Sequence, residues 1–99
     1  MTIVELDELV LEEEGLAGAY IKRHMGFPAD MGSNLDAIYD MLTELCHPVT
    51  IRIRRKQYTE SRPYFKRVLG MIRDAAEENA ALTVEEYQPI PWIGGQQGV

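Results

Sequence analysis

The chain has 99 residues, which fits one domain because a second would need roughly another hundred residues. Its 16 acidic and 10 basic residues give a formal net charge of −6, which disfavours direct binding to nucleic acid or to a membrane and favours a basic partner. The single cysteine, Cys46, excludes an internal disulfide and indicates a reducing, cytoplasmic location. We expect no secretory signal, membrane span, metal or cofactor.

The charges are distributed unevenly along the chain. Residues 1–46 hold ten acids and two bases, whereas residues 52–73 hold eight bases and one acid. This asymmetry predicts an acidic side and a basic side. Both sides can simply be solvated faces; the alternative is that the acidic side attracts a cationic partner.

The chain is predicted to begin with a strand and a helix. Residues 2–6 are β-branched and apolar, as is typical of a strand. Acids at residues 12–14 suit the positive end of a helix dipole, although no clear N-cap precedes them. The helix should end at Gly26, which can adopt a left-handed conformation, and Pro28 prevents continuation.

A loop over residues 28–33 leads to a second predicted helix. Ser33 or Asn34 can serve as its N-cap, and the helix should end near residues 46–47. Its apolar residues recur at helical spacing: Leu35, Ile38, Leu42 and Leu45.

The remainder is predicted to form a strand, a helix and a strand. Residues 49–54 alternate between apolar and polar types, which indicates a strand with one buried face. Ser61 is a plausible N-cap of a helix that Asn79 ends in place of glycine. That helix carries an apolar stripe made of Phe65, Val68, Leu69, Ile72, Ala75 and Ala76. The last strand, residues 82–85, should lie at a sheet edge because its polar residues are charged.

The order strand, helix, helix, strand, helix, strand predicts an α/β fold. Strands joined through helices pair in parallel, so we expect a small three-stranded parallel sheet packed with about three helices. Residues 1–87 would form this domain. Residues 88–99 hold two prolines and three glycines and are predicted to be an irregular tail.

Three carboxylates on the second helix are spaced four residues apart. Asp36, Asp40 and Glu44 therefore form one stripe, away from the apolar face. Like charges at this spacing destabilise a helix by about 0.2–0.5 kcal/mol per pair. Two interpretations of the stripe are open: a helix face that is simply solvated, or a surface that binds a partner. A magnesium site is a weaker alternative because no further ligands are evident.

Residues 27–43, which read FPADMGSNLDAIYDMLT, resemble the barstar family of intracellular ribonuclease inhibitors. The family pattern there is a proline, then Gly-x-Asn-Leu-Asp-Ala-Leu-Trp-Asp, then Leu-Thr. The similarity continues through residues 48–54 and resumes over residues 68–77 and the last strand. It covers roughly residues 2–87.

The resemblance implies a protein that is not an enzyme. Barstar-like proteins use the second helix and the loop before it to block the active site of a secreted ribonuclease, inside the cell that makes it. It further implies a bacterial immunity protein, monomeric when free, that forms a 1:1 complex with a basic nuclease. The family's interface positions fall on Asp30, Met31, Gly32, Asn34, Leu35, Asp36, Tyr39, Asp40, Thr43, Glu44, Leu45 and Asp74.

Carboxylates on a rigid helix can occupy phosphate positions in a cleft lined with Arg, Lys and His. We expect Asp40 to be the central phosphate mimic, with Asp36 second and Asp74 third. Asp74 lies late in its helix, where the dipole disfavours an acid, although a surface salt bridge would explain it equally well. Tyr39 would supply apolar contact and a hydroxyl. Gly32 would allow close approach of the loop, or is simply a turn glycine.

The chain departs from the family pattern at four of these positions. Asp30 replaces an aromatic residue, Tyr39 and Leu45 each replace a tryptophan, and Asp74 replaces a glutamate. The cognate nuclease can therefore differ from the family's best-known target. The alternative function is an acidic adaptor for a basic protein without nuclease activity.

Overall fold

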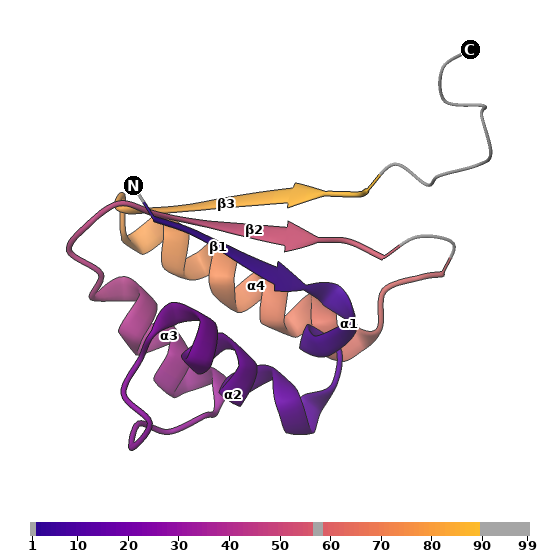
Figure 1. The fold of residues 1–99 in the computed structure, drawn as a ribbon, viewed down its shortest axis with the longest axis horizontal. Coiled ribbons are helices and arrows are strands. Elements are labelled where there is room, and N and C mark those ends of the chain that lie inside the picture. The colour runs from indigo at the N-terminus through magenta and orange to yellow at the C-terminus, as the bar shows by residue number, and fades with distance from the viewer. Residues whose placement is uncertain (1, 57–58, 90–99) are drawn as a thin grey trace, which may run out of the picture.

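The computed structural model describes residues 2–56 and 59–89 and forms a two-layer α/β domain (Figure 1). Its elements, in chain order, are β1 Thr2–Asp7, α1 Glu8–Leu11, α2 Glu14–Met25, α3 Leu35–Thr43, β2 Val49–Arg54, α4 Pro63–Glu78 and β3 Leu82–Tyr87. The strands pair in parallel in the order β1-β2-β3, which confirms the predicted sheet and places β3 at an edge.

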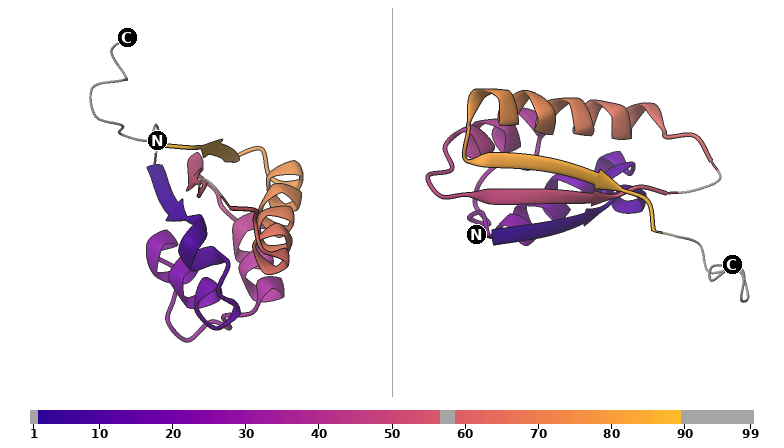
Figure 2. Two further views of the ribbon diagram at one scale, coloured as in Figure 1. Left: turned by 90° about the vertical axis from the view of Figure 1, so that its right-hand side faces the viewer. Right: turned by 90° about the horizontal axis from the view of Figure 1, so that it is seen from above.

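All four helices cover one face of the sheet, as the end-on view shows (Figure 2). Alternation along each strand turns the apolar side chains toward the helices, as at Leu6 and Ile53, which are fully buried. The opposite face is mostly polar, although Ile3 is exposed on it. There Glu5, Arg52 and Glu85 stand in register across the three strands, and Arg52 and Glu85 approach within 3.6 Å.

The core lies between the sheet and the helices. Burying one such aliphatic or aromatic side chain contributes about 1.5–3 kcal/mol. The core members are Val4, Leu6, Leu11, Ala17, Ile21, Ile38, Leu42, Val49, Ile51, Ile53, Phe65, Val68, Ile72, Ala75 and Leu82. Of the stripe predicted for α4, only Leu69 and Ala76 are partly exposed.

A short helix, α1, follows β1 directly and was not predicted. The carboxylate of Asp7 accepts a hydrogen bond from the Leu9 backbone at 2.9 Å, which caps this single turn. The chain then begins α2 at Glu14, so of the acids at residues 12–14 only Glu14 lies in the first turn, and Glu13 holds the N-cap position without a side-chain bond. The end of α2 is as expected, because Gly26 has φ 74°.

Three other helix ends differ from the predictions. Helix α3 ends at Thr43 rather than near residues 46–47. After Thr43, the Glu44 backbone N–H donates to the Met41 carbonyl three residues back, as in the tighter turn that often ends a helix. Ser61 is not the N-cap of α4; Arg62 holds that position without a side-chain bond. Asn79 follows α4 but is extended (φ −136°) rather than left-handed.

Within residues 2–56 and 59–89, none of the helices has the length and hydropathy that crossing a bilayer requires. Residues 90–99, which hold nearly all of the predicted tail, lie outside the described part of the chain.

Candidate protein-binding surface

The predicted partner-binding residues lie on three segments. Most are on α3 and on the loop before it; Glu44 and Leu45 follow α3, and Asp74 is on α4. None of them is buried. The exposed members are Asp30, Gly32, Asn34, Asp36, Asp40, Glu44 and Asp74, and the half-buried ones are Met31, Leu35, Tyr39, Thr43 and Leu45.

An open groove of about 510 Å³ lies on the surface between the packed helices α3 and α4. One wall is formed by Leu35, Asp36 and Tyr39, and the other by Arg67, Gly70, Met71 and Asp74. The fold thus brings Asp74 to the same groove as Asp36, although 38 residues separate them in sequence. The α4 residues recur every three or four positions, so their spacing marks one helix face that the sequence analysis passed over.

Five exposed carboxylates surround Tyr39 or line this groove, and we call them the acidic surface: Asp36, Asp40, Asp74, Glu77 and Glu78. The pKa of the Tyr39 hydroxyl is raised above 10.0, first by partial burial and then by the charges of Glu78, Asp74, Asp40 and Glu77. Glu77 and Glu78 were not predicted, because only the packing of α3 on α4 brings them close to Tyr39.

The carboxylates of the acidic surface have no ion-pair partner among residues 2–56 and 59–89. The salt bridge considered as an alternative explanation for Asp74 is therefore not found in that part of the chain. Arg67 lines the same groove, but it forms no ion pair with these carboxylates in the described residues. Two packed helices thus carry an excess of negative charge, which is the pattern that attracts a cationic partner.

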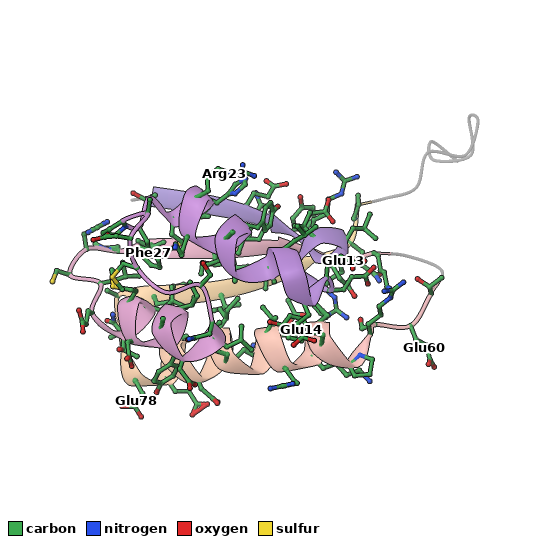
Figure 3. All side chains as sticks on the ribbon, turned by 90° about the horizontal axis from the view of Figure 1, so that it is seen from below. Glu13, Glu14, Arg23, Phe27, Glu60 and Glu78 are labelled. Atoms are coloured by element: carbon green, nitrogen blue, oxygen red, sulfur yellow. The ribbon has the colours of Figure 1, made fainter. Side chains whose placement is uncertain are left out.

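Charged residues elsewhere in the domain show the opposite arrangement. Five of the eight bases in residues 52–73 form ion pairs with described residues, and Glu8, Glu12 and Glu13 of the acidic first half are among their partners. The predicted acidic and basic sides are thus only partly separate. In Figure 3 the labelled Glu13 and Glu60 lie at one end of the molecule and Glu78 lies at the other.

Helix α3 is held at both ends. The Asn34 side chain accepts a hydrogen bond from the Ala37 backbone at 2.8 Å, which confirms Asn34 as the N-cap. At the other end, the Asn79 amide donates to the carbonyls of Leu42, Thr43 and Leu45 at 3.0–3.2 Å. Asn79 thereby satisfies carbonyls that a helix end leaves free and ties α3 to the end of α4.

The loop glycine Gly32 does not have a positive φ, unlike Gly26, so its backbone conformation does not demand glycine. A Cβ at Gly32 would lie 3.3 Å from the Ala37 Cβ, which is a tight contact. A side chain at this position would therefore require Ala37 to move slightly.

No three His, Cys, Asp or Glu side chains in the described ranges are arranged to hold a metal ion.

Comparison with protein families matches residues 4–88 to the family described as Barstar (barnase inhibitor). The match spans most of the chain, from β1 to just beyond β3. The chain belongs to the barstar family. No curated protein matches it. The barstar match includes the loop, α3 and α4, which together carry the groove and the acidic surface.

Proposed function

We propose that this protein is a stoichiometric inhibitor of a secreted ribonuclease and blocks the active site of that enzyme with α3 and the loop before it. The acidic surface carries the proposal, because its five exposed carboxylates have no ion-pair partner in the described part of the chain. Membership of a family described as barnase inhibitors supports it.

The chemistry of the target explains why carboxylates would serve this purpose. A ribonuclease stabilises a phosphodiester and the charge of its transition state with Arg, Lys and His side chains. A carboxylate held on a helix can take the place of the phosphate and form charge-assisted, often bidentate, bonds to arginine. We assign this role to Asp40 first, then to Asp36 and Asp74, with Tyr39 packing between them and the partner.

The groove between α3 and α4 supports this assignment. Leu35, Tyr39 and Met71 give it an apolar lining, and its charged residues are two carboxylates, Asp36 and Asp74, and one base, Arg67. Such a groove suits a basic side chain with a long apolar stem, since the stem and the charged end find different surroundings. The proposal predicts that a lysine or arginine of the nuclease enters it.

The remaining parts of the proposal follow from this function. The protein would act in the cytoplasm of the cell that secretes the nuclease, as an immunity protein in a 1:1 complex, and it would itself catalyse no reaction. Residues 1–87 would be sufficient for inhibition, and the other proposed contacts are Asp30, Met31, Gly32, Asn34, Thr43, Glu44 and Leu45.

The test is an RNase assay with purified Asp40→Ala and Glu60→Ala variants. The nucleases are barnase and any small secreted protein encoded beside this gene. Both variants remove one exposed carboxylate, but Glu60 lies at the far end of the molecule (Figure 3). Asp40→Ala should raise the inhibition constant at least about 100-fold, because it leaves a buried cation of the nuclease unpaired.

Glu60→Ala should change the inhibition constant less than about twofold, since a distant exposed charge acts only through screened attraction. Equal effects of the two variants would show that net charge, rather than the acidic surface, determines binding. A wild-type protein that inhibits neither nuclease, yet captures a basic protein without nuclease activity, would contradict the proposal and support an adaptor.

A further inference from the structure

Lys22 is a lysine with little access to solvent. It lies on α2 with only 9% of its surface exposed, whereas lysine is almost never buried without partners. Its ammonium group donates to the Ala29 carbonyl at 3.2 Å, to the Ser33 hydroxyl at 3.2 Å and to the Met31 carbonyl. The three donors of one ammonium thus meet three acceptors, all from the loop before α3.

The acceptors alternate along the loop. Ala29, Met31 and Ser33 provide them, and Asp30 and Gly32 lie between; of these five residues only Met31 is half-buried, and the others are exposed. A single buried cation therefore ties three points of an exposed loop to α2. Asp30 and Gly32 are among the residues proposed to contact the nuclease.

Gly18, one turn before Lys22, allows the loop to approach α2. A Cβ built at Gly18 would lie 1.7 Å from the Ser33 carbonyl oxygen, a distance that no side chain can occupy. The backbone of Phe27 also donates to the Lys22 carbonyl at 2.9 Å, which fixes the start of the loop. The loop is thus attached to α2 at its beginning, middle and end.

We propose that Lys22 is a positioning residue, which fixes the loop before α3 in its binding conformation before the nuclease arrives. This inference rests on the proposed function. Ordering a flexible loop during association costs conformational entropy that weakens the complex, and a loop that is already ordered avoids this cost. Lys22 therefore supports binding although its charge has the wrong sign for a cationic partner.

That sign makes the inference testable with a matched pair of variants, Lys22→Met and Lys66→Met. Lys66 is an exposed lysine on α4, and each substitution changes the net charge from −6 to −7. If attraction alone mattered, both variants would bind a basic nuclease as well as wild type or better. We expect Lys66→Met to do so and Lys22→Met to bind roughly 10- to 100-fold more weakly.

The free protein provides a second measurement that does not depend on any nuclease. The Met31 amide donates to the Pro28 carbonyl at 3.2 Å, so its hydrogen exchange reports the order of the loop. Exchange at Met31 should be at least about tenfold faster in Lys22→Met, with the Ala37 amide at the start of α3 unchanged. A role confined to global stability would accelerate both amides together.

Ser33→Ala removes one acceptor from an exposed position and serves if Lys22→Met does not fold. It should weaken binding severalfold and accelerate exchange at Met31. Unchanged affinity and unchanged exchange in the folded variants would overturn the inference. If the wild-type protein inhibits no nuclease, the proposed function fails, while exchange in the free protein still decides whether Lys22 orders the loop.

Discussion

Two groups of carboxylates in this protein have contrasting surroundings. Glu8 is fully buried and accepts hydrogen bonds from Arg55, from the Lys56 backbone and from Ser61 at 2.7–2.9 Å. The carboxylates of the acidic surface are exposed and have no ion-pair partner in the described residues. The same chemical group thus binds the domain together at one end and remains available at the other.

The contrast shows that net charge alone does not identify a binding surface. Glu8, Glu12 and Glu86 add to the charge of −6, but Arg55, Lys56 and Arg73 neutralise them locally. The charges that can attract a partner are carboxylates without an ion-pair partner in the described residues, as are those of the acidic surface on α3 and α4. The following predictions separate the two groups by their effects on folding and on titration.

Glu8→Ala should have the largest effect on folding. It removes the acceptor of three hydrogen bonds and leaves Arg55 with Glu86 as its ion-pair partner in the described chain. Because Arg55 stays paired, the main cost is that of donors left without their acceptor, typically about 1–3 kcal/mol. Urea denaturation should show a loss of this size, against less than about 0.5 kcal/mol for the exposed Glu60→Ala. Equal stabilities would mean that the Glu8 contacts do not stabilise the fold.

The contribution of Glu8 should also depend on pH. Burial alone would raise the pKa of this carboxyl, but bonds from Ser61, the Lys56 backbone and Arg55 hold the pKa below its ordinary value of 4.5. A lowered folded-state pKa stabilises the fold above the unfolded-state pKa, and this stabilisation disappears as pH falls through the folded-state value. The difference in unfolding free energy between wild type and Glu8→Gln should therefore shrink as pH falls below 4.5. A difference that stays constant down to acid unfolding would contradict this.

Asp40→Asn should slightly raise the free energy of unfolding, whereas Glu8→Ala lowers it. Asp40 lies four residues from both Asp36 and Glu44, so neutralising it relieves two repulsive pairs of about 0.2–0.5 kcal/mol each. Urea denaturation at low salt should show a gain of roughly 0.5 kcal/mol that fades as salt is added. The same variant should lose inhibition, so stability and binding would change in opposite directions. A loss of 1 kcal/mol or more in stability, beyond roughly ±0.5 for a surface change, would assign Asp40 to the fold.

Most of the fold was predictable because it depends on local patterns. The alternation of residues 49–54 and the stripe of α4 gave the sheet and its largest helix, and Asn34 marked the start of α3. Helix α1 was missed because four residues are too few to show a helical period. The role of Glu8 was missed for a different reason, since Arg55 and Ser61 are 47 and 53 residues away.

The candidate surface was predictable only in part. The spacing of Asp36 and Asp40 indicated one helix face. The inclusion of Asp74 came from the family resemblance, and its unfavourable place late in a helix was only a further hint. Lys22 gave no signal, because its three acceptors depend on the path of a loop that contains no periodic element. Supporting residues of this kind become visible only when the packed structure is known.

The smallest predicted effect is a shift in the pKa of Tyr39, which tests the acidic surface. Burial and four neighbouring carboxylates raise the pKa of Tyr39 above 10.0. Glu78→Gln removes the largest of the charge contributions, so the pKa of Tyr39 should fall toward 10.0. Added salt should also lower the pKa of Tyr39, because it screens the exposed charges around the hydroxyl. Ring carbon resonances in NMR spectra report each tyrosine separately.

Tyr87 is the control for this titration. The pKa of Tyr87 is also raised, but chiefly by a direct hydrogen bond from its hydroxyl to Glu5, across the outer face of the sheet. Neither Glu78→Gln nor moderate salt should change it much, since a short-range bond is screened far less than distant charges. Parallel shifts of Tyr39 and Tyr87 would show that the charges of the domain act as one diffuse field. A shift confined to Tyr39 would show that uncompensated charge is concentrated between α3 and α4, where the nuclease is proposed to bind.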